Sequence, residues 1–193
     1  RITEVILHPR WTVPYKIASK ELLPIIQKNS NYLDDNNFEV LDVYGQVVDP
    51  LTIDWASLSA KKFPYTLRQS SGVGNSLGVI KLNFYNPFNT YLHDTPQKGL
   101  FKKSKRYFSH GCMRVEKIVP LAHLLLDKKM LLNANKLKEN DSLYGYAPII
   151  LSTKERVPIL ILYNTAWVDA EGKIGFYEDV YGKFSLQQEN NIE

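Results

Sequence analysis

The chain has 193 residues, of which 44% are hydrophobic and 23% charged, so it can fold around a core of its own without a metal or disulfide staple. Its single cysteine excludes an internal disulfide and leaves the redox compartment open. The formal net charge of +4 is not gathered into the basic stripe typical of nucleic-acid-binding proteins. No apolar run approaches the roughly 20 residues that a membrane-spanning helix needs.

The first residues predict a strand that starts abruptly. Residues 2–7, ITEVIL, are rich in β-branched side chains. No signal-peptide pattern precedes them, and the sequence opens as if in mid-strand. We therefore expect a trimmed or processed chain.

The segment from about 12 to 66 is predicted to be an insertion with its own small helices. Residues 16–28, KIASKELLPIIQK, carry apolar side chains at helical spacing, and Pro24 is expected to kink or restart the helix. Residues 38–45, FEVLDVYG, predict a short strand.

The glycine-rich stretch 70–78, SSGVGNSLG, does not indicate a nucleotide site. It lacks both the dinucleotide-binding fingerprint and the GK[ST] ending of a phosphate-binding loop. The next residues, 79–85, alternate apolar and polar side chains and predict a half-buried strand.

The rest of the chain predicts more strands than helices. One helix is expected from Pro120 to Met130, with Leu121, Leu124 and Leu125 on its apolar face and His123 at the surface. The expected extended segments are 91–96, 106–112, 148–151, 157–163 and 175–181. The predicted fold class is mainly β with helical additions.

Cys112, in SHGCMR, is the candidate nucleophile. A free thiol, with a reference pKa of about 8.5, is only a few per cent thiolate at neutral pH, so it needs a base such as His93 or His110. If residues 108–112 are extended, His110 and Cys112 share a face. Gly111 then lets a substrate approach, and the N–H groups of Gly111 and Cys112 are candidate donors to an oxyanion.

Other interpretations of this cysteine are weaker. A small buried thiol is the common alternative. A zinc site built on His93, His110 and Cys112 lacks a fourth ligand. A papain-like protease would have its histidine far downstream, whereas both nearby histidines lie upstream. We therefore expect neither a metal nor a cofactor.

The motif resembles that of a known family. His93, fifteen residues and then Ser-His-Gly-Cys at 109–112 resemble the signature of the L,D-transpeptidase catalytic domain, the YkuD-like family. The flanking text NSLGVIKLNFYN, YLHDTP and TAWVDAEGKIGFYEDVYG resembles its YcbB-like branch. The resemblance implies a β-sandwich or barrel over residues 1–193, without its N-terminal strands, and with a helical cap inserted at about 12–66.

The resemblance also implies a reaction. The cysteine attacks the carbonyl of the third residue of a peptidoglycan tetrapeptide stem, D-alanine leaves, and an acceptor stem resolves the thioester into a 3→3 cross-link. Carbapenem-type β-lactams are expected covalent inhibitors, and the expected location is the periplasm or cell envelope. The alternatives are an L,D-carboxypeptidase and a non-catalytic wall-binding or regulatory module.

The family's roles carry over onto matching residues. His93 is the expected base, the carbonyl of Asp94 orients its ring, and His110 positions substrate or lies beside the oxyanion. Arg114 stands where many short relatives have asparagine, and either a substrate carboxylate or a structural salt bridge is an expected partner. The candidate substrate-binding residues are Tyr91, Ser109, Arg114, Arg106 and Trp11.

The sequence leaves two features of the substrate and product open. It does not identify the diamino acid at the third stem position. It also does not decide among cross-linking, protein anchoring and trimming.

Overall fold

The computed structural model describes residues 1–72, 74–126, 149–153 and 157–184. They belong to two compact units, Arg1–Pro158 and Ile159–Glu193, and each is described here by itself.

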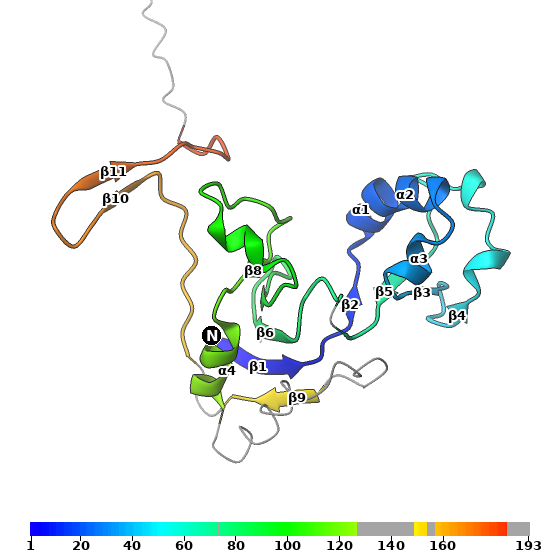
Figure 1. Cartoon of the computed structure of the whole chain (residues 1–193), viewed down its shortest axis with the longest axis horizontal. Coiled ribbons are helices and arrows are strands. Elements are labelled where there is room, and N and C mark those ends of the chain that lie inside the picture. Colours follow the sequence, from blue (N-terminus) through cyan, green and yellow to red (C-terminus); the bar gives the residue numbers. More distant parts are fainter. Residues whose placement is uncertain (73, 127–148, 154–156, 185–193) are drawn as a thin grey trace, which may run out of the picture. The chain divides into compact units, whose positions relative to one another are not determined.

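A five-stranded sheet, sheet A, forms the first part of the larger unit (Figure 1). Its strand β1 (Ile2–Leu7) pairs antiparallel with both β6 (Ile80–Phe84) and β9 (Ile149–Ser152). Strand β6 pairs antiparallel with β7 (Leu92–His93), and β7 pairs parallel with β8 (Met113–Arg114). The predicted strands at 2–7 and 79–85 are therefore confirmed. In spatial order the strands are β8, β7, β6, β1 and β9.

The two faces of sheet A differ in chemistry. On one face, Val5 lies opposite Leu82 and Leu82 opposite Leu92. Helix α4 (Ile118–Leu125) covers this face, and its buried residues join Val5 and Leu82 in one hydrophobic core (Figure 1). Successive side chains of a strand alternate between faces, so the intervening residues of β6 and β7 point to the other face, where the candidate site lies.

A four-stranded antiparallel sheet, sheet B, forms a second core in the same unit. Its order is β2 (Trp11–Thr12), β5 (Thr66–Gln69), β3 (Phe38–Leu41) and β4 (Val47–Val48). The helical segments are α1 (Tyr15–Ile17), the π-helix η1 (Ala18–Leu22), α2 (Leu23–Lys28), α3 (Tyr32–Asp35), and the 3₁₀ turns η2 (Pro50–Thr52) and η3 (Trp55–Ser57).

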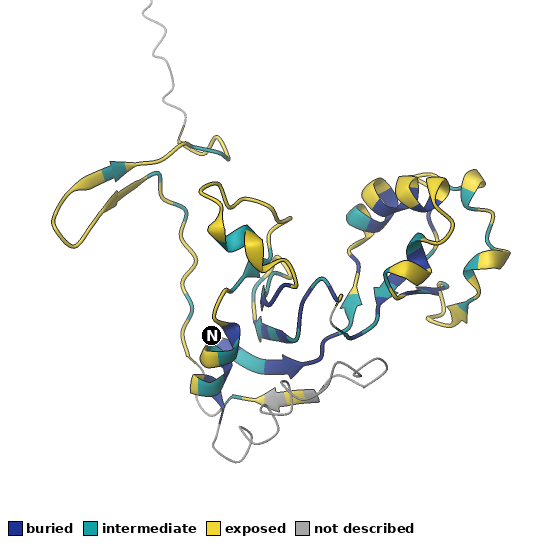
Figure 2. Cartoon of the chain, viewed as in Figure 1, coloured by how far each residue is buried: buried dark blue, intermediate teal, exposed yellow. Residues whose placement is uncertain are grey.

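A hydrophobic core of its own holds sheet B and its helical segments together. Leu23, Leu33, Val40 and Leu67 are fully buried within it, and the helices keep their outer sides exposed (Figure 2). Pro24 lies in the first turn of α2, directly after the π-helical η1, and Leu22 and Leu23 both keep helical backbone angles. The helix therefore runs on through Pro24 and changes from π to α type just before it, where a kink or a restart was predicted. That residues 12–66 are a cap inserted over an active site stays a prediction.

The smaller unit contains a β-hairpin of β10 (Ala166–Val168) and β11 (Ile174–Phe176). The Asp169 carboxylate accepts hydrogen bonds from the N–H groups of Glu171 and Lys173, which fixes its turn. Both strands are largely exposed (Figure 2).

Several element predictions are corrected. Residues 157–163 form no strand, and the predicted strand at 175–181 ends with β11 at Phe176. Residues 106–112 are not a strand either, because β8 begins only at Met113.

The predicted helix at 120–130 needs a second set of corrections. Its described part, α4, begins earlier, at Ile118, and residues 127–130 lie outside the described part of the chain. Leu124 is 84% exposed, contrary to its predicted place on the apolar face. His123 is half-buried rather than at the surface, and its buried Nε2 has no hydrogen-bond partner among the described residues.

Candidate active site

Two hydrogen bonds between β7 and β8 bring the histidine and cysteine segments together. The Met113 N–H donates to the Tyr91 carbonyl at 3.0 Å, and the Val115 N–H donates to the His93 carbonyl at 2.9 Å. His93 consequently pairs with Arg114 in register. Cys112, which immediately precedes β8, thus comes beside Tyr91.

The ring of His93 is oriented by a backbone carbonyl. Its Nδ1 lies 2.5 Å from the carbonyl oxygen of Asp94, and the residue is 4% exposed. A carbonyl only accepts, so Nδ1 carries the proton and Nε2 remains an acceptor. Burial lowers the pKa of His93 from 6.5 to about 4, with the positive charges of Arg114 and Lys81 acting in the same direction. The imidazole is therefore neutral near pH 7.

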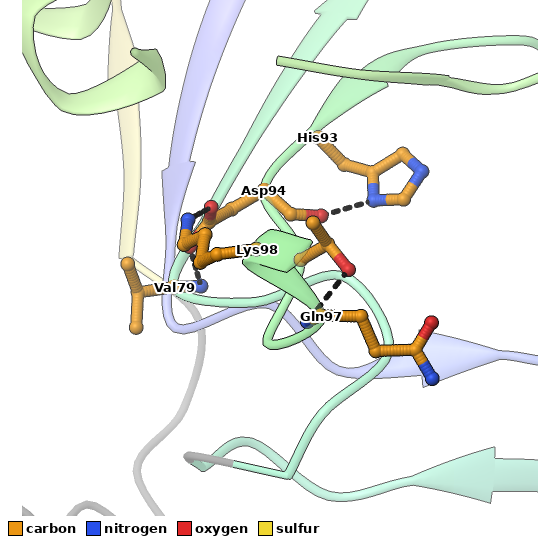
Figure 3. A network of polar contacts seen from close by, with 6 residues as sticks. Val79, His93, Asp94, Gln97 and Lys98 are labelled. Carbon is orange, nitrogen blue, oxygen red and sulfur yellow. Dashed lines mark hydrogen bonds and ion pairs between the residues drawn. The ribbon is translucent and has the colours of Figure 1, made fainter. Parts of the chain in front are cut away.

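Asp94 is fixed by contacts on both its backbone and its side chain (Figure 3). The Asp94 N–H donates to the Ile80 carbonyl at 2.9 Å. Its buried carboxylate accepts from the Val79 N–H at 3.2 Å and pairs with the Lys98 ammonium. These contacts hold the carbonyl that orients His93.

Tyr91 links the cysteine to sheet B. Cys112 lies beside Tyr91 in the register of β7 with β8, and the side chains of Cys112 and Trp11 both influence the pKa of the Tyr91 hydroxyl. Burial raises the pKa of Tyr91, and the neighbouring Cys112 raises it further, so the hydroxyl stays protonated and can donate to sulfur. Its ring lies edge-on to that of His93, with centroids 5.8 Å apart. Tyr91 thus lies between Cys112 and Trp11 of sheet B.

The segment Ser109–Gly111 bends instead of extending. Gly111 has φ +129°, a conformation that other residues adopt only with strain, and its N–H donates to the Ser109 hydroxyl at 3.3 Å. His110 Nε2 lies 2.9 Å from the Glu21 carboxylate of η1. The alternation argument that placed His110 and Cys112 on one strand face is wrong, because this bend interrupts the strand.

The two arginines hold loop carbonyls. Arg114 Nη1 donates to the Phe108 carbonyl at 3.1 Å, and its buried Nε has no partner in the described part of the chain. Arg106 is exposed and its Nε donates to the Lys103 carbonyl at 2.8 Å. Arg114 lines the cavity described next, whereas Arg106 does not.

A cavity of about 860 Å³ opens over these residues. Such a volume suits a peptide-sized ligand. The residues from sheet A and its loops that line it include Tyr91, His93, Ser109, His110, Cys112 and Arg114. Those from residues 11–38 include Trp11, Glu21, Leu22, Tyr32 and Phe38.

Sequence reasoning missed two residues at the site, Lys81 and Glu21. Lys81 Nζ lies 4.2 Å from the centroid of the Tyr91 ring. The period-two pattern of 79–85 did place Lys81 on the polar face of its strand, but the partner strand was needed to show what that face meets. No local signal in the sequence marks Glu21 as a partner of His110.

The described residues show neither a metal-binding cluster nor a membrane-spanning helix. They contain no group of three His, Cys, Asp or Glu side chains that could hold a metal ion. Among the helices of the same residues, none is both long and apolar enough to cross a membrane.

The sequence of the chain matches a known family over most of its length. The model of the YkuD family, the L,D-transpeptidase catalytic domain, matches residues 1–157. The chain belongs to this family. The resemblance and the mainly β fold class with helical additions are thereby confirmed, whereas assignment to the YcbB-like branch stays a prediction.

One curated relative of this L,D-transpeptidase domain comes from Haemophilus influenzae and is named "Putative L,D-transpeptidase". The two are 36% identical over 182 residues, which is 94% of this chain. The chain spans only 36% of the length of that relative, about a third.

Proposed function

We propose that this L,D-transpeptidase domain is an acyltransferase that acts on peptidoglycan tetrapeptide stems, with Cys112 as the nucleophile. One observation carries the proposal. The Asp94 carbonyl orients the ring of His93 so that Nε2 is free to accept a proton. Strand β7, which contains His93, pairs with β8, and Cys112 immediately precedes β8. Both His93 and Cys112 line the cavity. An uncharged, oriented imidazole near a thiol is the arrangement that thiol acyl transfer needs.

In the first half-reaction His93 Nε2 takes the thiol proton and Sγ attacks the carbonyl carbon of the third stem residue. The bond from that carbon to the nitrogen of the terminal D-alanine then breaks. The imidazolium returns its proton to the departing amine. The product is a thioester on Cys112 and free D-alanine.

In the second half-reaction the side-chain amine of an acceptor stem attacks the thioester. His93 accepts a proton from this amine, a new amide forms, and the sulfur of Cys112 leaves and is reprotonated. The result is a 3→3 cross-link. Water in place of the amine would give L,D-carboxypeptidase activity, the alternative within the same mechanism.

The tetrahedral oxyanion needs hydrogen-bond donors, and we assign the N–H groups of Cys112 and Gly111. One such donor contributes roughly 3–4 kcal/mol to the transition state of acyl transfer. The Gly111 N–H donates to the Ser109 hydroxyl in this structure, so the substrate oxygen has to replace Ser109. The φ of +129° favours glycine at position 111. Because glycine has no side chain, the substrate can approach this N–H closely.

The remaining candidates are proposed to bind substrate. Arg114 lines the cavity, and its guanidinium is proposed to bind a carboxylate of the stem there. His110 is proposed to position the stem or assist at the oxyanion, and Trp11 and Tyr91 to line the donor pocket. Arg106, which lies outside the cavity lining, is the least supported of the set.

Such a substrate places the protein in the bacterial cell envelope, in the periplasm where the organism has one. Carbapenem-type β-lactams are proposed to acylate Cys112, because their strained amide presents the same reacting carbonyl.

The function is tested with purified disaccharide tetrapeptides and mass spectrometry of the products. We expect dimers linked 3→3 together with free D-alanine from the native protein, and none from Cys112→Ala. His93→Ala should lower the rate at least about 100-fold, the usual contribution of a general base. His123→Ala is the matched control and should keep most of the activity.

The other outcomes are equally informative. Tripeptide monomers without dimers would assign the carboxypeptidase reaction instead. No product from a folded native protein would favour the non-catalytic module. Equal losses in His93→Ala and His123→Ala would contradict the role given to His93.

A further inference from the structure

Lys81 is a half-buried cation on the site face of sheet A. It lies directly opposite His93 in the pairing of β6 with β7. Its Nζ lies 4.2 Å from the centroid of the Tyr91 ring. The Met113 N–H donates to the Tyr91 carbonyl at 3.0 Å, which places Cys112 beside this tyrosine, and the Cys112 side chain influences the pKa of its hydroxyl. The Lys81 ammonium, the Tyr91 ring with its hydroxyl, and the Cys112 side chain therefore lie next to one another in that order.

The physical consequence of this series concerns the sulfur. A cation over an aromatic face is attracted to the ring electrons, most strongly where water is excluded. It draws electron density from the phenol, so the Tyr91 hydroxyl becomes a stronger donor. A hydrogen bond to an anion is roughly twice as strong as one between neutral groups, so the benefit appears once the sulfur is a thiolate.

The positive charge of Lys81 matters because a buried His93 is poorly suited to provide a positive charge beside the thiolate. Burial lowers the pKa of His93 to about 4, so its ring resists the proton that it takes from the thiol. Burial also lowers the pKa of Lys81, but attraction to Cys112, and then to Glu4, opposes this effect. Lys81 is thus a positive charge that is already present when the thiolate forms.

The neighbouring elements bring few competing charges to this face. Glu4 of β1 is bonded to Asn83 Nδ2 at 2.9 Å, and β7 contributes Tyr91 and His93. Arg114 lies in register with His93 on β8. Helix α4, with His123, covers the opposite face of the sheet.

We propose that Lys81 is a positioning residue for the nucleophile, which stabilises the thiolate of Cys112 through the ring and hydroxyl of Tyr91. This inference rests on the proposed function in one respect, namely that the thiolate of Cys112 is the reacting group. It adds a residue that the sequence motif does not contain.

The test is the pH dependence of alkylation by iodoacetamide, followed by intact-protein mass. Since Cys112 is the only cysteine of the chain, every adduct reports on it. We expect Lys81→Met to move the midpoint of the alkylation profile up by about half to one pH unit, which makes the reaction roughly three- to tenfold slower below the midpoint. Lys81→Arg, which keeps a cation over the ring, should stay within about twofold of the native rate.

Two further variants sharpen the test. Lys102→Met removes the same charge at an exposed position, and its profile should match that of the native protein because solvent screens distant surface charges. Tyr91→Phe keeps the ring but removes the hydroxyl, and it should shift the midpoint upward like Lys81→Met. It also keeps the proposal testable should Lys81→Met fail to fold.

A native profile in folded Lys81→Met or in Tyr91→Phe would overturn the inference, as would equal shifts in Lys81→Met and Lys81→Arg. The assay needs no peptidoglycan substrate. Shifted profiles without cross-linked products would therefore refute the proposed function alone, whereas products without a shift would refute only the role of Lys81.

Discussion

Asp94 uses its backbone and its side chain for different tasks. The carbonyl fixes the ring of His93, and the carboxylate is held by the Val79 N–H and Lys98. The carboxylate lies so close to Gly78 that a Cβ on that glycine would stand 2.5 Å from Cβ and Oδ2 of Asp94. At the scale of single residues, the tautomer of the base therefore depends on a glycine fifteen positions earlier in the chain.

Gly78→Ala tests this dependence, with Gly45→Ala as its control. Both glycines have positive φ, +62° and +78°, but a Cβ on Gly45 would meet nothing within 4 Å. Gly45→Ala should cost about 1 kcal/mol of unfolding free energy from backbone strain alone. Gly78→Ala should cost about 1–3 kcal/mol more, because it also overpacks Asp94. Chemical denaturation measures both, and equal losses would contradict the clash.

His93 makes the stability of the fold sensitive to acid. Its pKa is about 4 in the folded chain and about 6.5 when unfolded, so the unfolded state binds more protons between these values. The stabilising contribution is complete above about pH 6.5 and is lost as the pH falls towards 4. By linkage the loss amounts to about 3 kcal/mol.

His93→Gln should remove most of that loss. The measurement is the free energy of unfolding by denaturant at pH 7 and at pH 4 in both proteins. His8, whose pKa burial also lowers, remains in both and contributes equally. An unchanged difference between the two pH values would show that His93 is not the group responsible.

At the scale of elements, α4 shows how a start position decides which residues face a core. The helix begins at Ile118, and its buried residues Ile118, Ala122 and Leu125 recur at intervals of four and three. Leu124 falls between these rows and is 84% exposed. The sequence pattern had grouped Leu124 with Leu125.

A pair of leucine truncations separates these two positions. Leu125→Ala should lower the unfolding free energy by about 2–5 kcal/mol, because it leaves a cavity in the core of sheet A. Leu124→Ala should change it by less than about 0.5 kcal/mol. Thermal or denaturant unfolding measures both, and a comparable loss at Leu124 would mean that this residue is covered.

Patterns within a few neighbouring residues were enough to predict the strands β6 and β1. The alternation of 79–85 and the β-branched residues of 2–7 identified β6 and β1. The apolar run 157–163 forms no strand, since hydrophobicity does not supply a partner: Ile161 and Leu162 are 52% and 63% exposed.

In the candidate site, too, the sequence motif predicted the reacting residues but not their contacts with distant parts of the chain. The motif itself indicated His93 and Cys112, and the family match supports that choice. The orientation of His110 could not be predicted, because it depends on the positive φ of Gly111 and on Glu21 of η1, a distant part of the sequence. Lys81 acquires its neighbours only through the register of β6 with β7.

At the scale of the whole molecule, the unit Arg1–Pro158 contains two hydrophobic cores and a cavity lined by residues of both sheets and their loops. The family match, residues 1–157, ends beside the end of that unit. The pair His110–Glu21 is one contact between the sheet A loop and the helices of the second core. Its side chains are 63% and 49% exposed, so it orients groups at the cavity rather than stabilising the fold.

Glu21→Gln tests that distinction. We expect the free energy of unfolding to change by less than about 1 kcal/mol, as for other exposed ion pairs. Denaturant titration of the full chain provides the measurement, with Leu125→Ala as the destabilised reference. A loss comparable to that of Leu125→Ala would assign the pair a structural role.

The central claim is that Cys112 is the acyl-accepting nucleophile, and intact-protein mass spectrometry after incubation with a carbapenem tests it most directly. Opening a β-lactam ring releases nothing, so the native protein should gain the mass of one carbapenem. Cys112→Ala should gain none. A folded native protein without the adduct, or an adduct that survives in Cys112→Ala, would contradict the account.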